Sequence, residues 1–190
     1  MFADYASACE YLLTRVNVER TRPEMVAPGV FKLDRMHALL DAMGNPHRHT
    51  RFVHVAGSKG KGSTCEMLVS CLASCGYTAG LYTSPHLIDL RERVRINRDM
   101  ISEGAFVEHL SIAAAAAERV ASEAGAATFF ELVTAAAFSY FARQAVDIAV
   151  IEVGLGGRLD STNVITPDVC AVTAIQLEHS QVLGSTLVLI

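Results

Sequence analysis

A chain of 190 residues fits a single domain, for which roughly 100–200 residues is the usual size. Of these residues, 51% are hydrophobic and 19% are charged, which is enough apolar material for a substantial core. The formal net charge of −4 does not indicate a nucleic-acid-binding surface, and no segment approaches the ~20 consecutive apolar residues of a membrane span. No secretory signal opens the sequence, so we expect a cytoplasmic protein with no nucleic-acid or membrane partner.

Residues 1–50 are predicted to form an N-terminal helical segment. Apolar residues recur at helical spacing over residues 5–16 and again over residues 31–43. Residues 19–29 contain two prolines and little periodicity, which predicts a loop between the two helices. Gly44-Asn45-Pro46 ends the second helix, because the glycine suits a left-handed cap and the proline cannot continue a helix.

Residues 51–190 alternate short apolar runs with helical patterns. The predicted strands are 52–56, 79–82, 148–151 and 170–175, and the predicted helices are 65–75, 102–124 and 130–143. Strands that are apolar throughout are typical of a parallel sheet that is covered on both faces. The expected fold is therefore α/β, with a mostly parallel sheet, right-handed crossovers and helices on both faces.

The five cysteines do not predict a disulfide framework, because their number is odd. Cys71 and Cys75 lie on one face of a predicted helix, with no third or fourth ligand near them for zinc. We expect these two residues and Cys65 to be buried or semi-buried structural thiols.

The segment between the first strand and the next helix predicts a phosphate-binding loop. Phosphate oxygens need several backbone N–H donors that converge on one point, and glycines let the main chain come that close. The start of the helix adds unpaired N–H groups, Lys61 can reach the outer phosphates, and Ser63 or Thr64 offers a hydroxyl to magnesium. The candidate nucleotide-binding residues are Gly57, Ser58, Lys59, Gly60, Lys61, Gly62, Ser63 and Thr64.

This loop departs from the usual nucleotide-binding pattern at two positions. Val55 stands where a glycine is usual, and Gly62 stands where a serine or threonine follows the lysine. The alternative interpretation is a glycine-rich turn without a ligand. Two lysines and the strand–loop–helix setting favour phosphate binding over that alternative.

The variant loop resembles that of the Mur-ligase superfamily, and specifically that of folylpolyglutamate synthase and dihydrofolate synthase. Further segments resemble that family in the same order, and the resemblance extends from about Tyr5 to Leu187. These segments are Val18-Glu19-Arg20-Thr21, residues 31–36, Leu81-Tyr82-Thr83-Ser84-Pro85-His86-Leu87, residues 92–97, Thr128-Phe129-Phe130-Glu131 and residues 152–163.

The resemblance implies an ATP-dependent ligase that works with Mg²⁺. Members of the family activate a carboxylate of dihydropteroate or tetrahydrofolate as an acyl phosphate, and the amine of L-glutamate then forms the amide. The parent proteins are monomers. Phosphoryl transfer of this kind depends mainly on positioning and on neutralised phosphate charge, which suits the residues of the loop.

The resemblance also implies roles for individual residues. Ser84, Glu152 and His179 match the magnesium-holding residues, and Lys61, Glu152 and His179 are the candidate catalytic residues. Arg93 is placed by its charge to meet a substrate carboxylate. The other candidate substrate-binding residues come from the N-terminal helix and the pterin side of the pocket: Asp34, Arg35, Thr128, Phe129, Phe130, Glu131, Leu159, Asp160 and Ser161.

Several of these residues have ordinary structural alternatives. Phe129 and Phe130 are equally suited to a core, and Glu131 suits the start of a helix, where an acid favours the dipole. His179 alone is compatible with a surface or core histidine. The alternating arginines at 91, 93 and 95 are compatible with a solvated strand edge.

Near its C-terminal end the sequence departs from the family. Leu177-Glu178-His179-Ser180 replaces the usual Leu-Asp-His-Thr, and the family's lysine-bearing helix does not follow. We therefore expect an incomplete nucleotide-binding domain over residues 51–190, without the C-terminal ligase domain.

An open sheet edge would then favour self-association. The alternative functions are a non-catalytic nucleotide-binding relict and a dimerising fragment. A small-molecule kinase is disfavoured, because the glycine-rich signature of residues 152–163 belongs to the ligases.

Overall fold

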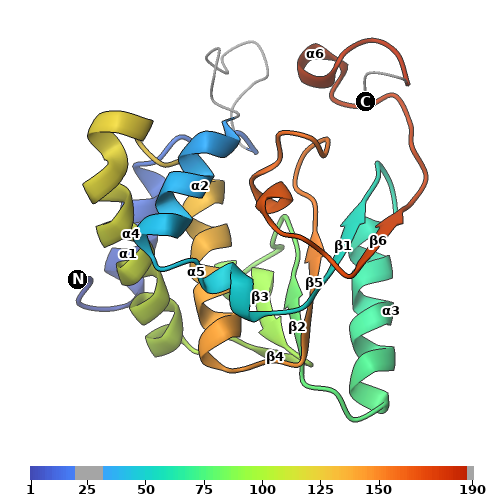
Figure 1. Ribbon diagram of the computed structural model, residues 1–190, viewed down its shortest axis with the longest axis horizontal. Helices are drawn as coiled ribbons and strands as arrows, with labels where there is room; N and C mark the ends of the chain where they lie inside the picture. Colours follow the sequence, from blue (N-terminus) through green and yellow to red (C-terminus); the bar gives the residue numbers. More distant parts are fainter. Residues whose placement is uncertain (20–31, 188–190) are drawn as a thin grey trace.

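The computed structural model, which describes residues 1–19 and 32–187, contains a six-stranded sheet in the order β4-β3-β2-β5-β1-β6 (Figure 1). Strands β2, β5, β1 and β6 run parallel, and β3 and β4 are antiparallel additions at one edge. The strands are β1 (Phe52–Ala56), β2 (Ala79–Tyr82), β3 (Val94–Ile96), β4 (Asp99–Met100), β5 (Ile148–Glu152) and β6 (Val169–Val172). The predicted α/β class with a mostly parallel sheet is confirmed.

Helices cover both faces of the sheet. The α-helices are α1 (Tyr5–Leu13), α2 (Leu33–Ala42), α3 (Lys61–Ser74), α4 (Glu103–Ala124), α5 (Phe129–Arg143) and α6 (Ser180–Leu183), and the 3₁₀ turns are η2 (Pro46–His49), η3 (Leu90–Arg93) and η4 (Ser161–Val164). The side-chain oxygens of Ser102 and Thr128 accept from backbone N–H groups and cap the first turns of α4 and α5.

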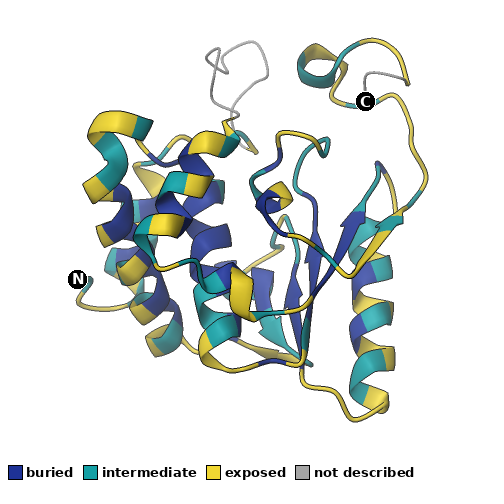
Figure 2. Cartoon of the chain, in the orientation of Figure 1, coloured by how far each residue is buried: buried dark blue, intermediate teal, exposed yellow. Residues whose placement is uncertain are grey.

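The two faces of the sheet carry cores of different size. On one face α5 packs between the sheet and α4, and α1 and α2 pack against α4, so that one large apolar cluster extends from the sheet to the N-terminal helices. On the other face α3 covers a smaller cluster around Val53, Val55 and Val150. Figure 2 shows the buried faces of α4 and α5 in the larger layer and the mostly exposed outer surface of α3.

The register of the sheet aligns the ends of its parallel strands. Val55 of β1 lies opposite Glu152 of β5 and Ala171 of β6. Tyr82 of β2 lies opposite Ile151 of β5. The loops that follow these four strands therefore leave the sheet at the same edge, which is where open α/β sheets bind their ligands.

Four elements differ from the sequence predictions. Strands β3 and β4 were not predicted, because they are very short and partly polar. Helix α3 begins at Lys61 rather than at residue 65, so the second half of the predicted phosphate loop is its first turn. Strand β6 ends at Val172 rather than at residue 175, because the next residues turn across the phosphate loop.

Some sequence predictions lie outside the described residues. These are residues 20–29 of the predicted 19–29 loop, the motif residues Arg20 and Thr21, the first residue of the second helix and the last three residues of the sequence. Within the described part of the chain, no helix is both long enough and apolar enough to cross a membrane.

The prediction for two cysteines was wrong. Cys65 is buried, but Cys71 and Cys75 are exposed. The reason is that α3 buries a narrow face around Cys65 and Val69, and Cys71 and Cys75 lie off that face.

The close approach of β2 to its neighbours yields a stability prediction. A Cβ atom on Gly80 would lie 2.9 Å from Phe141 Cδ1 and 3.0 Å from Ala149 Cβ. We expect Gly80→Ala to lower the free energy of unfolding by about 1–3 kcal/mol in denaturant titrations followed by circular dichroism. Gly104→Ala is the matched control, because Gly104 lies in α4 with no atom near its Cβ position. This control should be neutral or stabilising by up to about 1 kcal/mol, and equal losses in both variants would contradict the account.

Candidate functional site

The predicted phosphate loop lies between β1 and α3. Gly57 has φ +134°, and a Cβ atom there would collide with the side chain of Thr173, so both conformation and space require glycine. Gly60, with φ +82°, is the N-cap of α3, and Lys61 is the first residue of that helix. The ammonium group of Lys61 donates a hydrogen bond to the Gly57 carbonyl at 2.7 Å, which holds the lysine over the loop.

Residues 173–179, which we call the strap, cross this loop after β6. The Ser58 amide donates to the Ala174 carbonyl at 2.9 Å. The Ser58 hydroxyl donates to the Gln176 carbonyl at 3.1 Å and accepts from the Gln176 amide at 3.0 Å. The Lys59 ammonium lies 3.2 Å from the Glu178 carboxylate. The strap therefore sets the shape of the phosphate loop through contacts more than 110 residues apart in sequence.

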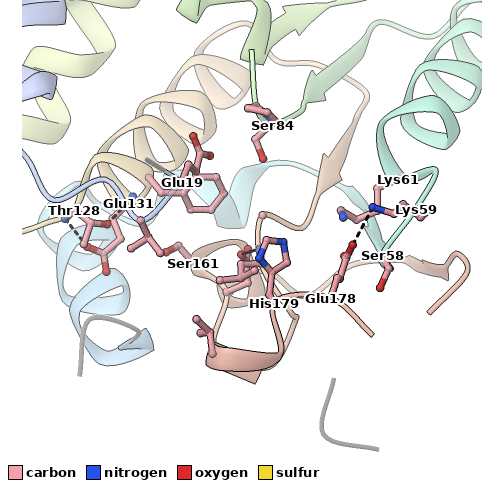
Figure 3. Close-up of a pocket in the computed structure, with 17 residues that line it drawn as sticks. Glu19, Ser58, Lys59, Lys61, Ser84, Thr128, Glu131, Ser161, Glu178 and His179 are labelled. Carbon is pink, nitrogen blue, oxygen red and sulfur yellow. Dashed lines mark hydrogen bonds and ion pairs between the residues drawn. The ribbon is translucent and has the colours of Figure 1, made fainter. Parts of the chain in front are cut away.

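A pocket of about 510 Å³ opens beside the loop (Figure 3). Its wall is formed by the segments that follow α1, β1, β2, β5 and β6, and by the start of α5. Its lining residues are Val18, Glu19, Ser58, Lys59, Lys61, Ser84, Pro85, Thr128, Phe130, Glu131, Gly154, Leu155, Asp160, Ser161, Glu178, His179 and Val182.

Glu152 is the last residue of β5, and its side chain contacts both the segment after β2 and the start of α3. One of its carboxylate oxygens accepts from the Ser84 amide at 3.0 Å. A Cβ atom on Gly62 would lie 3.6 Å from the same oxygen, so the first turn of α3 is also in contact. Burial raises the pKa of Glu152, against the opposing effects of the Ser84 and Gly62 amides and the charge of Lys61. A buried carboxylate of this kind gains from a cation.

The three residues predicted to hold magnesium are only partly gathered. Ser84 and His179 both line the pocket, and Glu152 contacts the backbone of Ser84. Within residues 1–19 and 32–187, no three His, Cys, Asp or Glu side chains gather closely enough to hold a metal ion. Magnesium commonly takes one or two carboxylates and fills its other positions with water and phosphate oxygens. The hydroxyl of Ser84 and the carboxylate of Glu152 fit that donor set.

A buried ion pair supports the pocket wall at the start of α5. The Arg35 side chain, from α2, donates through Nε to both oxygens of Glu131 at 2.8 and 3.0 Å. Glu131 also accepts from the Thr128 amide at 2.8 Å, and the Thr128 hydroxyl accepts from the Glu131 amide at 3.2 Å. Glu131 therefore acts as the helix-start acid of a capping box and as the buried partner of an arginine.

Arg93 supports the neighbouring wall and is almost fully buried. Its guanidinium group makes two hydrogen bonds to Glu19, at 2.5 and 2.8 Å, and a third to His86 Nδ1 at 2.8 Å. It also lies 5.2 Å from the centre of the Phe129 ring. Arg93 is therefore not part of a solvated strand edge, and it could meet a substrate carboxylate only by leaving Glu19.

The structure brings some of the predicted substrate-binding residues together and separates others. Thr128, Phe130, Glu131, Asp160 and Ser161 line the pocket with Lys59 and Lys61. The other candidates do not line it: Asp34 and Leu159 are exposed, Arg35 is buried against Glu131, and Arg93 and Phe129 are buried against each other.

Seven pocket residues were not among the candidate site residues of the sequence: Val18, Glu19, Pro85, Gly154, Leu155, Glu178 and Val182. Among them, Glu19, Gly154, Leu155 and Glu178 lie inside or beside the segments that resemble the family. The position of these four residues in or beside those segments is the sequence feature that could have identified them.

Most of the negative charge on the pocket wall is already paired. Glu19 is held by Arg93, Glu131 by Arg35, and Glu178 by Lys59. Asp160 accepts hydrogen bonds from the Leu155 amide and from the amide and hydroxyl of Thr162. Lys61 is hydrogen-bonded to the loop carbonyl and lies at the helix N-terminus, where an anion would be stabilised. The arrangement can therefore bind an anionic ligand beside a partly apolar recess.

Comparisons with known proteins point to a single family, although no family model matches the chain. The chain is 43% identical to folylpolyglutamate synthase of Lacticaseibacillus casei over 155 residues, which is 80% of this chain and 36% of that protein. It is 39% identical over 191 residues to dihydrofolate synthase/folylpolyglutamate synthase of Bacillus subtilis, which is 98% of this chain and 42% of that protein.

Among solved structures, an FPGS–AMPPCP–folate complex matches with a TM-score of 0.88 at 37% identity, covering 98% of this chain and 44% of that one. The chain thus spans less than half the length of these proteins.

The Arg35–Glu131 pair yields a second stability prediction. We expect Arg35→Ala to lower the free energy of unfolding by about 3–5 kcal/mol, because it leaves a buried carboxylate without its cation. Arg51→Ala is the matched control, since its pair with Asp168 is exposed at 3.4 Å, and it should cost at most about 1 kcal/mol. Denaturant unfolding of both variants measures the difference. Similar small losses in the two variants would show that the buried pair does not support the wall.

Proposed function

Because the chain belongs to the folylpolyglutamate synthase and dihydrofolate synthase family, we propose that it binds ATP and the folate-type substrate of a glutamate ligase. The reaction joins L-glutamate to a dihydropteroate or folate carboxylate. The observation that carries the proposal is the meeting of a phosphate loop, a buried carboxylate and a partly apolar pocket at one sheet edge. The fold that carries this edge is similar to that of a complex with the ATP analogue AMPPCP and folate.

In this proposal the phosphates of ATP bind at the N-terminus of α3. The backbone at the start of α3 supplies N–H donors, whereas the Ser58 amide already donates to the Ala174 carbonyl, and the dipole of a 14-residue helix favours negative charge at this end. Lys61 exchanges its contact with the Gly57 carbonyl for a phosphate oxygen. The hydroxyl of Ser63 or Thr64 lies in the first turn of the same helix.

The Ser84 hydroxyl and the Glu152 carboxylate are the residues that would hold Mg²⁺, and we propose His179 as a third contact from the strap. When bound, Mg²⁺ neutralises charge on the outer phosphates. The protein's own contribution is to hold Glu152 in place through the Ser84 amide and to keep it partly shielded from water. Burial disfavours the charged form of Glu152 and therefore raises its pKa.

The proposed ligase reaction has two steps. A carboxylate oxygen of the acceptor attacks the γ-phosphorus of ATP, and ADP leaves as the acyl phosphate forms. The amine of L-glutamate then attacks the acyl carbon, phosphate leaves, and loss of a proton completes the amide. Positioning and charge neutralisation, rather than a protein nucleophile, supply most of the rate enhancement in such transfers.

The wall formed by Thr128, Phe130, Asp160 and Ser161 is the proposed site for the pterin end of the acceptor. Phe130 offers an aromatic surface, and the other three residues offer polar groups that can fix orientation. A cytoplasmic location accompanies this proposal, since the reaction needs ATP.

The alternative is a chain that binds nucleotide without ligase chemistry, or that associates with a second copy through its sheet edge. Strand β6 pairs on one side with β1, and Val169 and Val172 on it are exposed. ATP hydrolysis that is stimulated by dihydropteroate or tetrahydrofolate would favour the ligase. Nucleotide binding without any pterin effect, together with a dimer in sedimentation, would favour the alternative.

Nucleotide binding gives the direct test of the phosphate loop. We expect Lys61→Ala to weaken the binding of Mg-AMPPCP by at least about tenfold in calorimetric titrations, because a charge-assisted contact to phosphate is lost. Lys32→Ala is the matched control, since Lys32 is exposed and outside the pocket, and its affinity should equal that of the wild type. Equal affinities in all three proteins, or no binding by the wild type, would overturn the proposed site.

A further inference from the structure

A buried chain of hydrogen bonds lies behind the pocket wall. His54 of β1 contacts the Thr162 hydroxyl of η4, with 2.8 Å between Nε2 and Oγ1. The Thr162 hydroxyl and amide both donate to one carboxylate oxygen of Asp160, and the Leu155 amide donates to the other at 2.8 Å. The exposed fractions of His54, Thr162 and Asp160 are 8%, 0% and 4%, so water does not compete for these contacts.

The hydrogen bonds determine which nitrogen of His54 carries a proton. A hydroxyl has one proton to donate, and that of Thr162 goes to the carboxylate of Asp160. The Thr162 oxygen must therefore accept from His54, which places a proton on Nε2. Burial lowers the pKa of His54, with a smaller opposing effect from Asp160, so the neutral ring with Nε2–H is the form expected near neutral pH.

The chain of contacts leads to a residue that faces the pocket. Asp160 lines the pocket together with Leu155, whose amide it binds. Three donors hold its carboxylate, so its orientation is set by the backbone of two loops and by the side chain of Thr162. His54 fixes Thr162 in turn, and it lies on the strand that leads into the phosphate loop.

We propose that His54 and Thr162 are positioning residues for Asp160: they fix the orientation of its carboxylate in the folate-side pocket and anchor it to β1. The inference rests on the proposed function, because Asp160 belongs to the proposed acceptor site. It goes beyond that function by assigning a role to two buried residues that do not line the pocket. Such support matters because a polar contact that is misplaced by a fraction of an ångström loses much of its strength.

Two substitutions at Thr162 test the role through ligand binding. Thr162→Val keeps the shape but removes the hydroxyl, and Thr162→Ser keeps the hydroxyl. Calorimetric titration with folate should show roughly tenfold weaker binding to Thr162→Val and recovery to within about threefold of wild type in Thr162→Ser. Binding of Mg-AMPPCP should stay within about twofold of wild type in both. Unchanged folate affinity in Thr162→Val, or a parallel loss for both ligands, would overturn the proposal.

A second measurement does not depend on ligand binding. Nitrogen-15 NMR of the histidine rings should show the neutral His54 ring protonated at Nε2, and exchange of the Leu155 amide should be faster in Thr162→Val than in wild type or Thr162→Ser. A proton on Nδ1, or equal exchange in all three proteins, would overturn the positioning role. If wild type binds no folate while these signals appear as expected, the proposed function fails and the positioning of Asp160 stands.

Discussion

The site depends on the common direction of four strands. Because β2, β5, β1 and β6 are parallel and in register, their carboxyl ends meet at one edge of the sheet. The segments that follow them supply Ser84, the phosphate loop, the glycine-rich loop at Gly154 and the strap. Residues far apart in sequence become neighbours through this topology, and the pocket follows from it.

The second constraint is electrostatic. Two buried arginines, Arg35 and Arg93, neutralise the acidic residues Glu131 and Glu19 from behind the pocket wall. This leaves the phosphate loop, with Lys61 and the positive end of α3, as the region where an anion gains most. The wall thus combines polar groups for recognition with little net repulsion toward the phosphates.

Much of the fold could be predicted from sequence because its signals are local. The apolar run at 52–56, the glycines after it and the serine and threonine caps of α4 and α5 each specify structure within a few residues. Strands β3 and β4 carry no such pattern. Their existence depends on pairing with β2, which sequence periodicity does not encode.

The site was predictable in its residue types and not in its contacts. The family resemblance predicted Glu131, and charge predicted Arg93, to be substrate-binding. Their partners, Arg35 and Glu19, lie 96 and 74 residues away in sequence. Likewise His54, in an apolar strand, gave no local sign that its ring reaches Thr162, 108 residues later. Side chains paired over such distances depend on the tertiary fold, and the roles of the individual site residues remain predictions.

We propose that the segments after the four parallel strands form one nucleotide-phosphate site. Amide-resolved hydrogen exchange, with and without Mg-AMPPCP, tests it most directly. We expect slower exchange at residues 57–63, at Ser84, at residues 154–157 and in the strap at 173–179, with no change in β4 or the middle of α4. Protection confined to the phosphate loop, or spread equally over α4, would contradict it.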